Sequence, residues 1–212
     1  MRARSIYRCS CLVCFLIICG CSDSNRRPHY APLMPLCVGN TWIYSAYMPD
    51  SGGGEPIYMR EDTMTIIGVA ELGGEDYFLT DVNFAFRSTT EGLSVALYEG
   101  SDFSNFEVLL RYPIVDGGEY KYSSPRVSQP ELLVRMMARE ETTPSGQYKT
   151  CTYEFWDLLG TPQLFLTFSF APRAGMVAIR NSVGSLWLLS AVILVEHEPN
   201  WPLQPATLYR WR

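Results

Sequence analysis

Hydrophobic and polar residues alternate with a period of two along most of the chain after residue 30. Positions 164, 166, 168 and 170 are Leu or Phe, while positions 167 and 169 are Thr and Ser. Similar alternation occurs in residues 42–46, 93–97, 106–112 and 151–155. Turn residues rich in Gly and Pro separate these runs, at 51–54, 73–74, 117–118, 144–146 and 172–175. Many short strands between such turns predict an all-β protein: an antiparallel sheet that forms a sandwich or a curved half-barrel.

Residues 131–141 are ambiguous, because they are rich in Leu, Met, Ala, Arg and Glu, which are good helix formers. Ser128 also stands three residues before Glu131, the spacing of a helix capping box. The same residues can alternate as a strand, with positions 132, 134, 136 and 138 forming an apolar face. Local pattern alone does not decide between the two.

An internal repeat favours the strand. Residues 39–44 (GNTWIY) resemble residues 117–122 (GGEYKY), and 66–84 resemble 134–155 in having two strands joined by a glycine turn. Residues 91–95 resemble 174–178, so the units follow the same order in both parts of the chain. The sequence therefore predicts two similar halves. Residues 132–139 should form a strand like residues 64–69, which are rich in β-branched side chains.

The N-terminus has the pattern of a bacterial secretion signal. Residues 1–8 contain three arginines and no acid, and residues 9–19 are apolar except for Ser10. This apolar run is shorter than the roughly 20 residues of a membrane-spanning helix. Residues 17–21 (IICGC) resemble the lipobox of bacterial lipoproteins, in which the cysteine receives a thioether-linked lipid. We expect cleavage before Cys21 and lipidation of that residue, with residues 1–20 as signal peptide, 21–29 as tether and 30–212 as a single β-rich domain.

Acylation of this kind predicts stable attachment to a membrane. In the lipoproteins that this segment resembles, Asp directly after the cysteine favours retention in the inner membrane, and this chain has Ser22 there. The resemblance therefore implies an anchor in the outer membrane, on either its periplasmic or its surface face.

Cleavage before Cys21 changes the net charge and the number of cysteines of the mature chain. The net charge of −5 becomes −8 when three arginines are removed, and no cluster of Lys and Arg remains to bind nucleic acid. Of seven cysteines, four lie in the signal peptide and Cys21 is lipidated, leaving Cys37 and Cys151. In an oxidising compartment these two can form a disulfide; the alternative is a pair of unrelated buried thiols, Cys151 sharing the apolar face of Tyr153 and Phe155.

Candidate catalytic and metal-binding residues are few. The two histidines are His29, in the tether, and His197, whose neighbours Glu196 and Glu198 point away from it on a strand. There is no nucleophile elbow and no phosphate-binding glycine loop. The acidic pairs 61–62, 75–76 and 140–141 flank turns and are expected to be solvated. We assign no catalytic residue, no metal ligand and no cofactor.

Three patches resemble a set of uncharacterised bacterial envelope lipoproteins. Residues 35–44 (PLCVGNTWIY) resemble their PLxVGNxWxY opening, and residues 146–151 (GQYKTC) resemble their GTFxxC strand. Residues 171–177 (APRAGMV) resemble their APGVGxV turn, with Arg173 and Ala174 departing from it, and residues 188–192 resemble their closing strand. These motifs are structural, so the resemblance carries no catalytic residues. It implies an architecture similar to the curved half-barrels of lipoprotein-carrier type proteins.

Aromatic residues are abundant and spread over both halves, including Trp42, Tyr44, Phe84, Phe165 and Trp187. They form either an ordinary β core or the lining of a concave apolar site. Three functions stay open: a membrane-anchored lipoprotein that acts by binding or interaction with an envelope protein, a carrier of an apolar ligand such as a lipid, and a hydrolase of envelope glycans or lipids.

Overall fold

The computed structural model describes residues 33–100, 102–195 and 207–209. They form one antiparallel sheet of thirteen strands. The strands are β1 (Thr41–Met48), β2 (Ile57–Leu72), β3 (Glu75–Thr80), β4 (Phe84–Ser88), β5 (Gly92–Glu99), β6 (Asp102–Arg111), β7 (Glu119–Tyr122), β8 (Leu132–Thr143), β9 (Gly146–Asp157), β10 (Gln163–Ala171), β11 (Gly175–Asn181), β12 (Leu186–Leu194) and β13 (Thr207–Tyr209). The described residues form no helix that could span a membrane.

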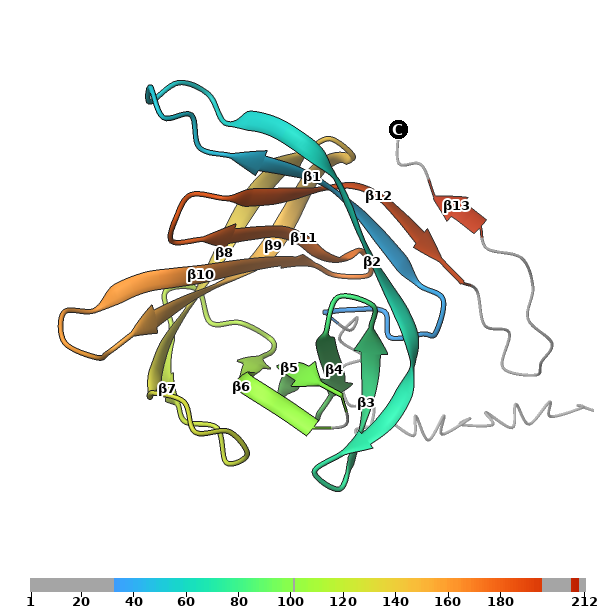
Figure 1. Cartoon of the computed structure of the whole chain (residues 1–212), viewed down its shortest axis with the longest axis vertical. Coiled ribbons are helices and arrows are strands. Elements are labelled where there is room, and N and C mark those ends of the chain that lie inside the picture. Colours follow the sequence, from blue (N-terminus) through green and yellow to red (C-terminus); the bar gives the residue numbers. More distant parts are fainter. Residues whose placement is uncertain (1–32, 101, 196–206, 210–212) are drawn as a thin grey trace, which may run out of the picture.

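The sheet is a meander whose order is β6-β5-β4-β3-β2-β1-β12-β11-β10-β9-β8-β7, with β13 added beside β12. It curls around a central space, so that β6 and β7, at the two ends of this order, approach each other (Figure 1). No strand pairing joins β6 to β7 in the described residues, and the curve is therefore an open barrel. The predicted all-β fold is confirmed, as a curved half-barrel type of sheet and not as a sandwich.

The ambiguous segment is a strand. Residues of β8 pair with β7 on one side and with β9 on the other, for example Val134 with both Tyr120 and Phe155. Leu132, Val134 and Met136 are buried, as expected for one face of a strand. Strand pairing on both sides satisfies the backbone groups that a helix would have bonded internally, and so overrides the helical preference of the side chains.

The two halves share backbone geometry as well as sequence pattern. In the first half, Gly39 N donates to Ile66 O at 2.8 Å and Ile66 N donates to Asn40 O at 2.9 Å. The second half repeats both bonds, since Gly117 N donates to Met136 O at 2.9 Å and Met136 N to Gly118 O at 2.8 Å. Gly39 and Gly117 have positive φ angles, of 94° and 73°, which suit glycine. The matching turns confirm the duplication, with β1–β6 as one half and β7–β12 as the other.

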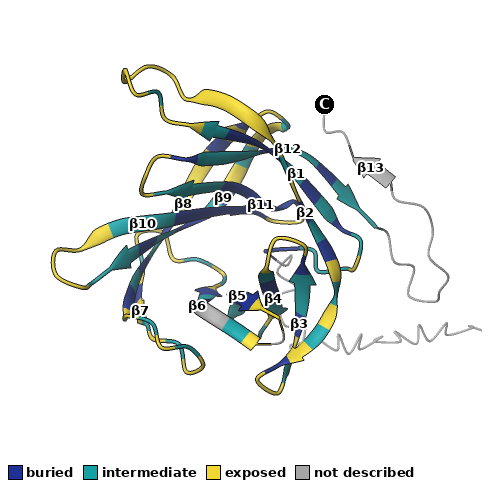
Figure 2. Ribbon diagram, in the orientation of Figure 1, coloured by how far each residue is buried: buried dark blue, intermediate teal, exposed yellow. Residues whose placement is uncertain are grey.

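Aromatic side chains fill most of the barrel interior. Trp42, Phe86, Phe155 and Phe168 are fully buried, and the ring of Phe155 lies 5.3 Å from that of Phe168 in an edge-to-face arrangement. The indole N–H of Trp42 donates to Ala174 O at 2.6 Å, so this buried polar atom is satisfied. Buried residues recur along most of the strands that surround the interior (Figure 2).

Two glutamates that the alternating pattern places away from the core are nevertheless buried. Glu141 was expected to be solvated as part of the pair 140–141, but it is 6% exposed and forms a two-pronged ion pair with Arg180 at 2.9 and 2.6 Å. Glu107 is fully buried and accepts hydrogen bonds from Tyr77, Ser124 and Arg126. Both carboxylates lie on the outer face of the sheet, where other segments cover them. The expectation for Glu141 is wrong because its partner comes from a distant strand.

Candidate apolar binding groove

The residues singled out in the sequence do not converge on one site. Cys21, His29, Glu196, His197 and Glu198 lie outside the described residues. Cys37 and Cys151 are free, half-buried thiols in this structure. Cys37 lies in the segment before β1, with its thiol near the carbonyl of Val38, whereas Cys151 packs against the core from β9.

Cys151 is half-buried, and less buried than its neighbours Tyr153 and Phe155, with which it shares a face. Burial raises the pKa of both the Cys37 and the Cys151 thiols, which disfavours the reactive thiolate. In this structure they are small apolar groups and not reactive centres.

Two adjoining apolar cavities open at one mouth of the barrel. The first has a volume of about 450 Å³ and is lined by Tyr44, Arg60, Asp62, Thr63, Met64, Val82, Phe84, Leu166, Ile179, Asn181 and Trp187. The second has a volume of about 460 Å³ and is lined by Phe84, Leu97, Phe106, Gln129, Pro130, Leu132, Asp157, Phe165 and Leu166. Phe84 and Leu166 line both, so the two cavities adjoin, and together they are here called the mouth groove. Each part lies within the usual size range of small-molecule sites.

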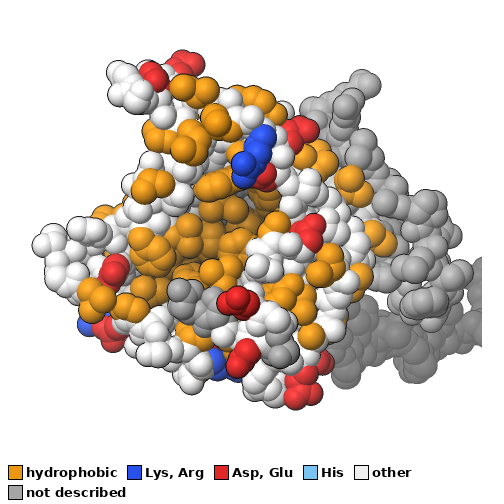
Figure 3. Space-filling model, in the orientation of Figure 1, with side chains coloured by type: hydrophobic (Ala, Val, Ile, Leu, Met, Phe, Trp, Pro, Cys, Tyr) orange, Lys and Arg blue, Asp and Glu red, His pale blue; other side chains and the backbone are white. Residues whose placement is uncertain are grey.

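The mouth groove is built by strands from all around the barrel. In Figure 3 it is a hollow lined with hydrophobic side chains, with charged side chains at its rim. Phe84 and Leu166 enter it from β4 and β10, one from each half of the chain. Phe84 packs against the core, because its ring lies 5.9 Å from that of Phe86 and 6.1 Å from that of Phe168. The packed aromatic core therefore forms the floor of the groove.

A charged cluster stands at the rim of the groove. Arg60 Nε donates to Asp62 Oδ1 at 2.7 Å, and Trp187 Nε1 donates to Asp62 Oδ2 at 2.9 Å. The Arg60 side chain is 72% exposed and that of Asp62 is 31% exposed. The hydrogen bond from Arg60 lowers the pKa of Asp62 below its usual value. Asp62 thereby fixes the indole of Trp187 as one wall of the groove.

Sequence reasoning found part of this lining. Tyr44, Phe84, Phe165 and Trp187 were among the aromatic residues considered for a concave site, and all four line the mouth groove. Trp42 and Phe155 instead belong to the packed core. Arg60 and Asp62 were missed, since Asp62 is part of an acidic pair that reads as solvated. The signal that could have found it is the alternation of residues 60, 62 and 64 along β2.

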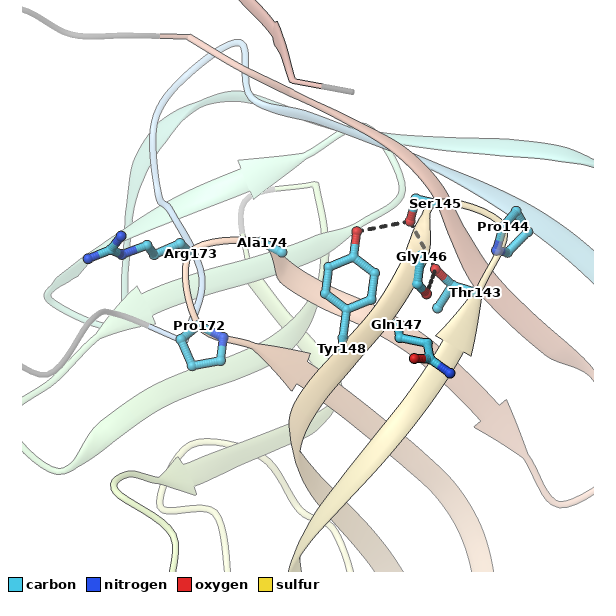
Figure 4. Close-up of a pocket in the computed structure, with 9 residues that line it drawn as sticks. All are labelled: Thr143, Pro144, Ser145, Gly146, Gln147, Tyr148, Pro172, Arg173 and Ala174. Atoms are coloured by element: carbon cyan, nitrogen blue, oxygen red, sulfur yellow. Dashed lines mark hydrogen bonds between the residues drawn. The ribbon is translucent and has the colours of Figure 1, made fainter. Parts of the chain in front are cut away.

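A further cavity, of about 570 Å³, lies between the β8–β9 and β10–β11 turns, at the other end of β9 and β10. Figure 4 shows its hydroxyl cluster, with Arg173 directed away from it. Ser145 Oγ lies 2.9 Å from Thr143 Oγ1 and 3.0 Å from Tyr148 Oη, and it donates to Leu189 O at 2.8 Å. These hydroxyls bond to one another and to the backbone, and among the residues that the structure describes no carboxylate or imidazole lines the cavity to activate them.

In the part of the chain that the structure describes, no three His, Cys, Asp or Glu side chains gather in a way that would hold a metal ion. The two carboxylates of the mouth groove, Asp62 and Asp157, lie in its two different parts, and both accept local hydrogen bonds. What the groove offers is an apolar surface with a polar rim, an arrangement suited to binding.

No family model matches the sequence, and no curated protein matches it. Among solved structures, the chain is similar to a protein of Parabacteroides distasonis that is assigned as a lipoprotein, with 12% identity and a TM-score of 0.39 over 77% of this chain and 99% of that one. It is also similar to a protein of Bacteroides fragilis, assigned as exported and having a YmcC-like fold, with 13% identity and a TM-score of 0.37 over 76% and 99% of the two chains. Likeness this distant assigns no function to this chain.

Proposed function

We propose that this chain is a bacterial envelope lipoprotein, held to the outer membrane by lipid on Cys21, that binds the apolar chain of an amphiphilic ligand in the mouth groove. The signal-like N-terminus and the IICGC pattern support export and lipidation. The apolar groove on a packed floor supports binding of a small ligand and carries the proposal.

The shape of the groove favours a lipid chain over a protein partner. A protein interface of ordinary stability is broad, whereas this surface is a depression ringed by strands of both halves. Its central residues Phe84 and Leu166 are only partly buried by the protein itself. Covering them with an acyl chain removes apolar surface from water, which contributes about 0.8 kcal/mol for each buried methylene.

A hydrolase is less well supported. Asp62 is bound by Arg60 and Trp187, and Asp157 accepts a hydrogen bond from Leu159 N at 2.7 Å. A pair of carboxylates that cleaves a glycosidic bond must face each other across the scissile bond with one poised as an acid. Asp62 and Asp157 line different parts of the groove, and both are already engaged in hydrogen bonds. Binding of a ligand without its chemical conversion is the function that the groove supports best.

The test is mass spectrometry of lipid that co-purifies with the full chain carrying Cys21→Ser, which has no acyl chain of its own. Leu166→Glu places a carboxylate at the centre of the groove and should lower the bound lipid about tenfold, because an unpaired charge is poorly tolerated against an apolar chain. Leu159→Glu is the matched control, since Leu159 is 70% exposed in the β9–β10 turn.

Val82→Glu provides a second variant with less risk to folding, because Val82 lines the groove but is 43% exposed. Thermal unfolding checks that each variant is folded. Equal lipid content in the parent, the groove variants and the control would overturn the proposal. Loss of lipid only in the two groove variants would support it.

A further inference from the structure

The polar groups at the rim of the mouth groove differ in how many hydrogen bonds they can still form with a ligand. Both carboxylate oxygens of Asp62 already accept hydrogen bonds, one from Arg60 and one from Trp187. Asn181 Oδ1 accepts from Ser185 N at 2.9 Å. These side-chain acceptors are therefore occupied within the described structure.

Hydrogen-bond donors at the same rim are still available to a ligand. Arg60 gives only its Nε to Asp62 among the described residues, which leaves its two terminal amino groups directed to solvent in a 72% exposed side chain. Arg60 is also the one cationic side chain among the described residues that line the groove. A guanidinium presents a planar set of donors that matches the oxygens of a carboxylate or a phosphate.

The distribution of charged and polar side chains along the groove also favours a polar ligand group beside Arg60. The part lined by Leu97, Phe106 and Phe165 contains no cationic side chain among the described residues, its amide, Gln129, is already bonded to the backbone of Glu107, and its carboxylate, Asp157, repels an acidic group. The part lined by Arg60 carries the remaining donors. An amphiphile that extends across Phe84 would place its tail in the first region and its head beside Arg60.

Resting on the proposed function, we infer that the ligand of the mouth groove is an amphiphile with an acidic head group, a carboxylate or a phosphate, which Arg60 binds. The net charge of Arg60 and Asp62 together is near zero, so Asp62 limits the attraction. Removing the charge of Arg60 and removing the charge of Asp62 should therefore change affinity for an acidic head in opposite directions.

The test measures displacement of the uncharged fluorescent probe N-phenyl-1-naphthylamine from the full Cys21→Ser chain by dodecanoate, dodecyl phosphate and dodecanol. We expect both acidic compounds to displace the probe at lower concentration than the alcohol. Arg60→Gln should weaken acid binding by about two- to fivefold, the range for an exposed ion pair. Asp62→Asn should strengthen it, and each change should alter binding of the two acids more than binding of dodecanol.

The matched control is Arg139→Gln, because Arg139 pairs with Glu154 at 3.0 Å and does not line the groove. A preference for only one of the two acids would support the inference and identify the head group. Equal displacement by all three compounds, or an acid preference that Arg60→Gln leaves unchanged, would overturn it. Failure of the probe to bind would instead overturn the proposed function, so the two failures are distinguishable.

Discussion

The side-chain amide of Gln129 pairs with the backbone of Glu107 as a neighbouring strand would. Gln129 Nε2 donates to Glu107 O at 2.6 Å, and Glu107 N donates to Gln129 Oε1 at 3.0 Å. Further along the same edge of β6, the Tyr120 hydroxyl donates to Leu109 O and accepts from Arg111 N, and the Tyr153 hydroxyl donates to Arg111 O. Side chains therefore protect the edge of β6 that faces away from β5, where no strand pairs with it among the described residues.

Gln129→Ala should destabilise the protein by about 1–3 kcal/mol, because both polar groups of the Glu107 backbone lose their partner in a covered position. Urea denaturation followed by circular dichroism measures this change. Gln147→Ala is the control, since Gln147 is exposed near the start of β9. Equal stability of the two variants would show that Gln129 does not protect the edge.

The ion pair between buried Glu107 and partly exposed Arg126 should matter more than one between two exposed side chains. Glu107 is fully buried, so Arg126→Ala leaves a charge with only neutral donors and should cost about 3 kcal/mol or more. Lys121→Ala breaks the exposed pair with Glu131 and should cost less than about 1 kcal/mol. The free energies of unfolding of the two variants decide the matter, and similar values would contradict this assignment.

The packing of Trp42 depends on the absence of a side chain at Gly175. A Cβ at that position would lie 2.8 Å from Trp42 Nε1, in a residue whose φ angle is 87°. Gly175→Ala should therefore lower the melting temperature more than Gly53→Ala, which has a φ angle of 76° but open space around it. Calorimetry of both variants separates contact from backbone strain, and equal shifts would mean that the Trp42 contact is unimportant.

Acidification should release Trp187 from Asp62. The pKa of Asp62 is lowered below 3.8, chiefly by the hydrogen bond from Arg60. A lowered pKa means that the bond of Asp62 contributes fully above about pH 4 and is lost as the pH falls through the folded-state value. The indole N–H signal of Trp187 in NMR should shift with a midpoint below 3.8 in the parent. In Asp62→Asn it should stay constant, and an unchanged titration there would contradict the assignment.

The fold was largely predictable because its determinants are local or repeated. Alternation and glycine turns give the strands, and the resemblance of residues 39–44 to 117–122 correctly overrode the helical preference of residues 132–139. The burial of Glu107 and Glu141 was not predictable, because each depends on an arginine that the fold brings from elsewhere. A single sequence does not contain that pairing.

The mouth groove was only partly predictable for the same reason. Its aromatic residues stand out in the sequence, but Phe84 and Leu166 are 82 positions apart and meet only when the sheet curls. In the sequence, Arg60 and Asp62 have the pattern of an exposed ion pair. Only the fold brings Trp187 of β12 beside them. The alternative of a disulfide between Cys37 and Cys151 likewise required positions that spacing does not supply.

The central claim is that an acyl chain occupies the mouth groove, and quenching of Trp187 fluorescence by brominated dodecanoate tests it most directly. Trp187 lines the groove, and its contribution is the difference between the full Cys21→Ser chain and the same chain carrying Trp187→Phe. We predict saturable quenching of that contribution, which is lost in Leu166→Glu and kept in Leu159→Glu. Saturable binding of the compound without quenching of Trp187 would place the ligand elsewhere and contradict the claim.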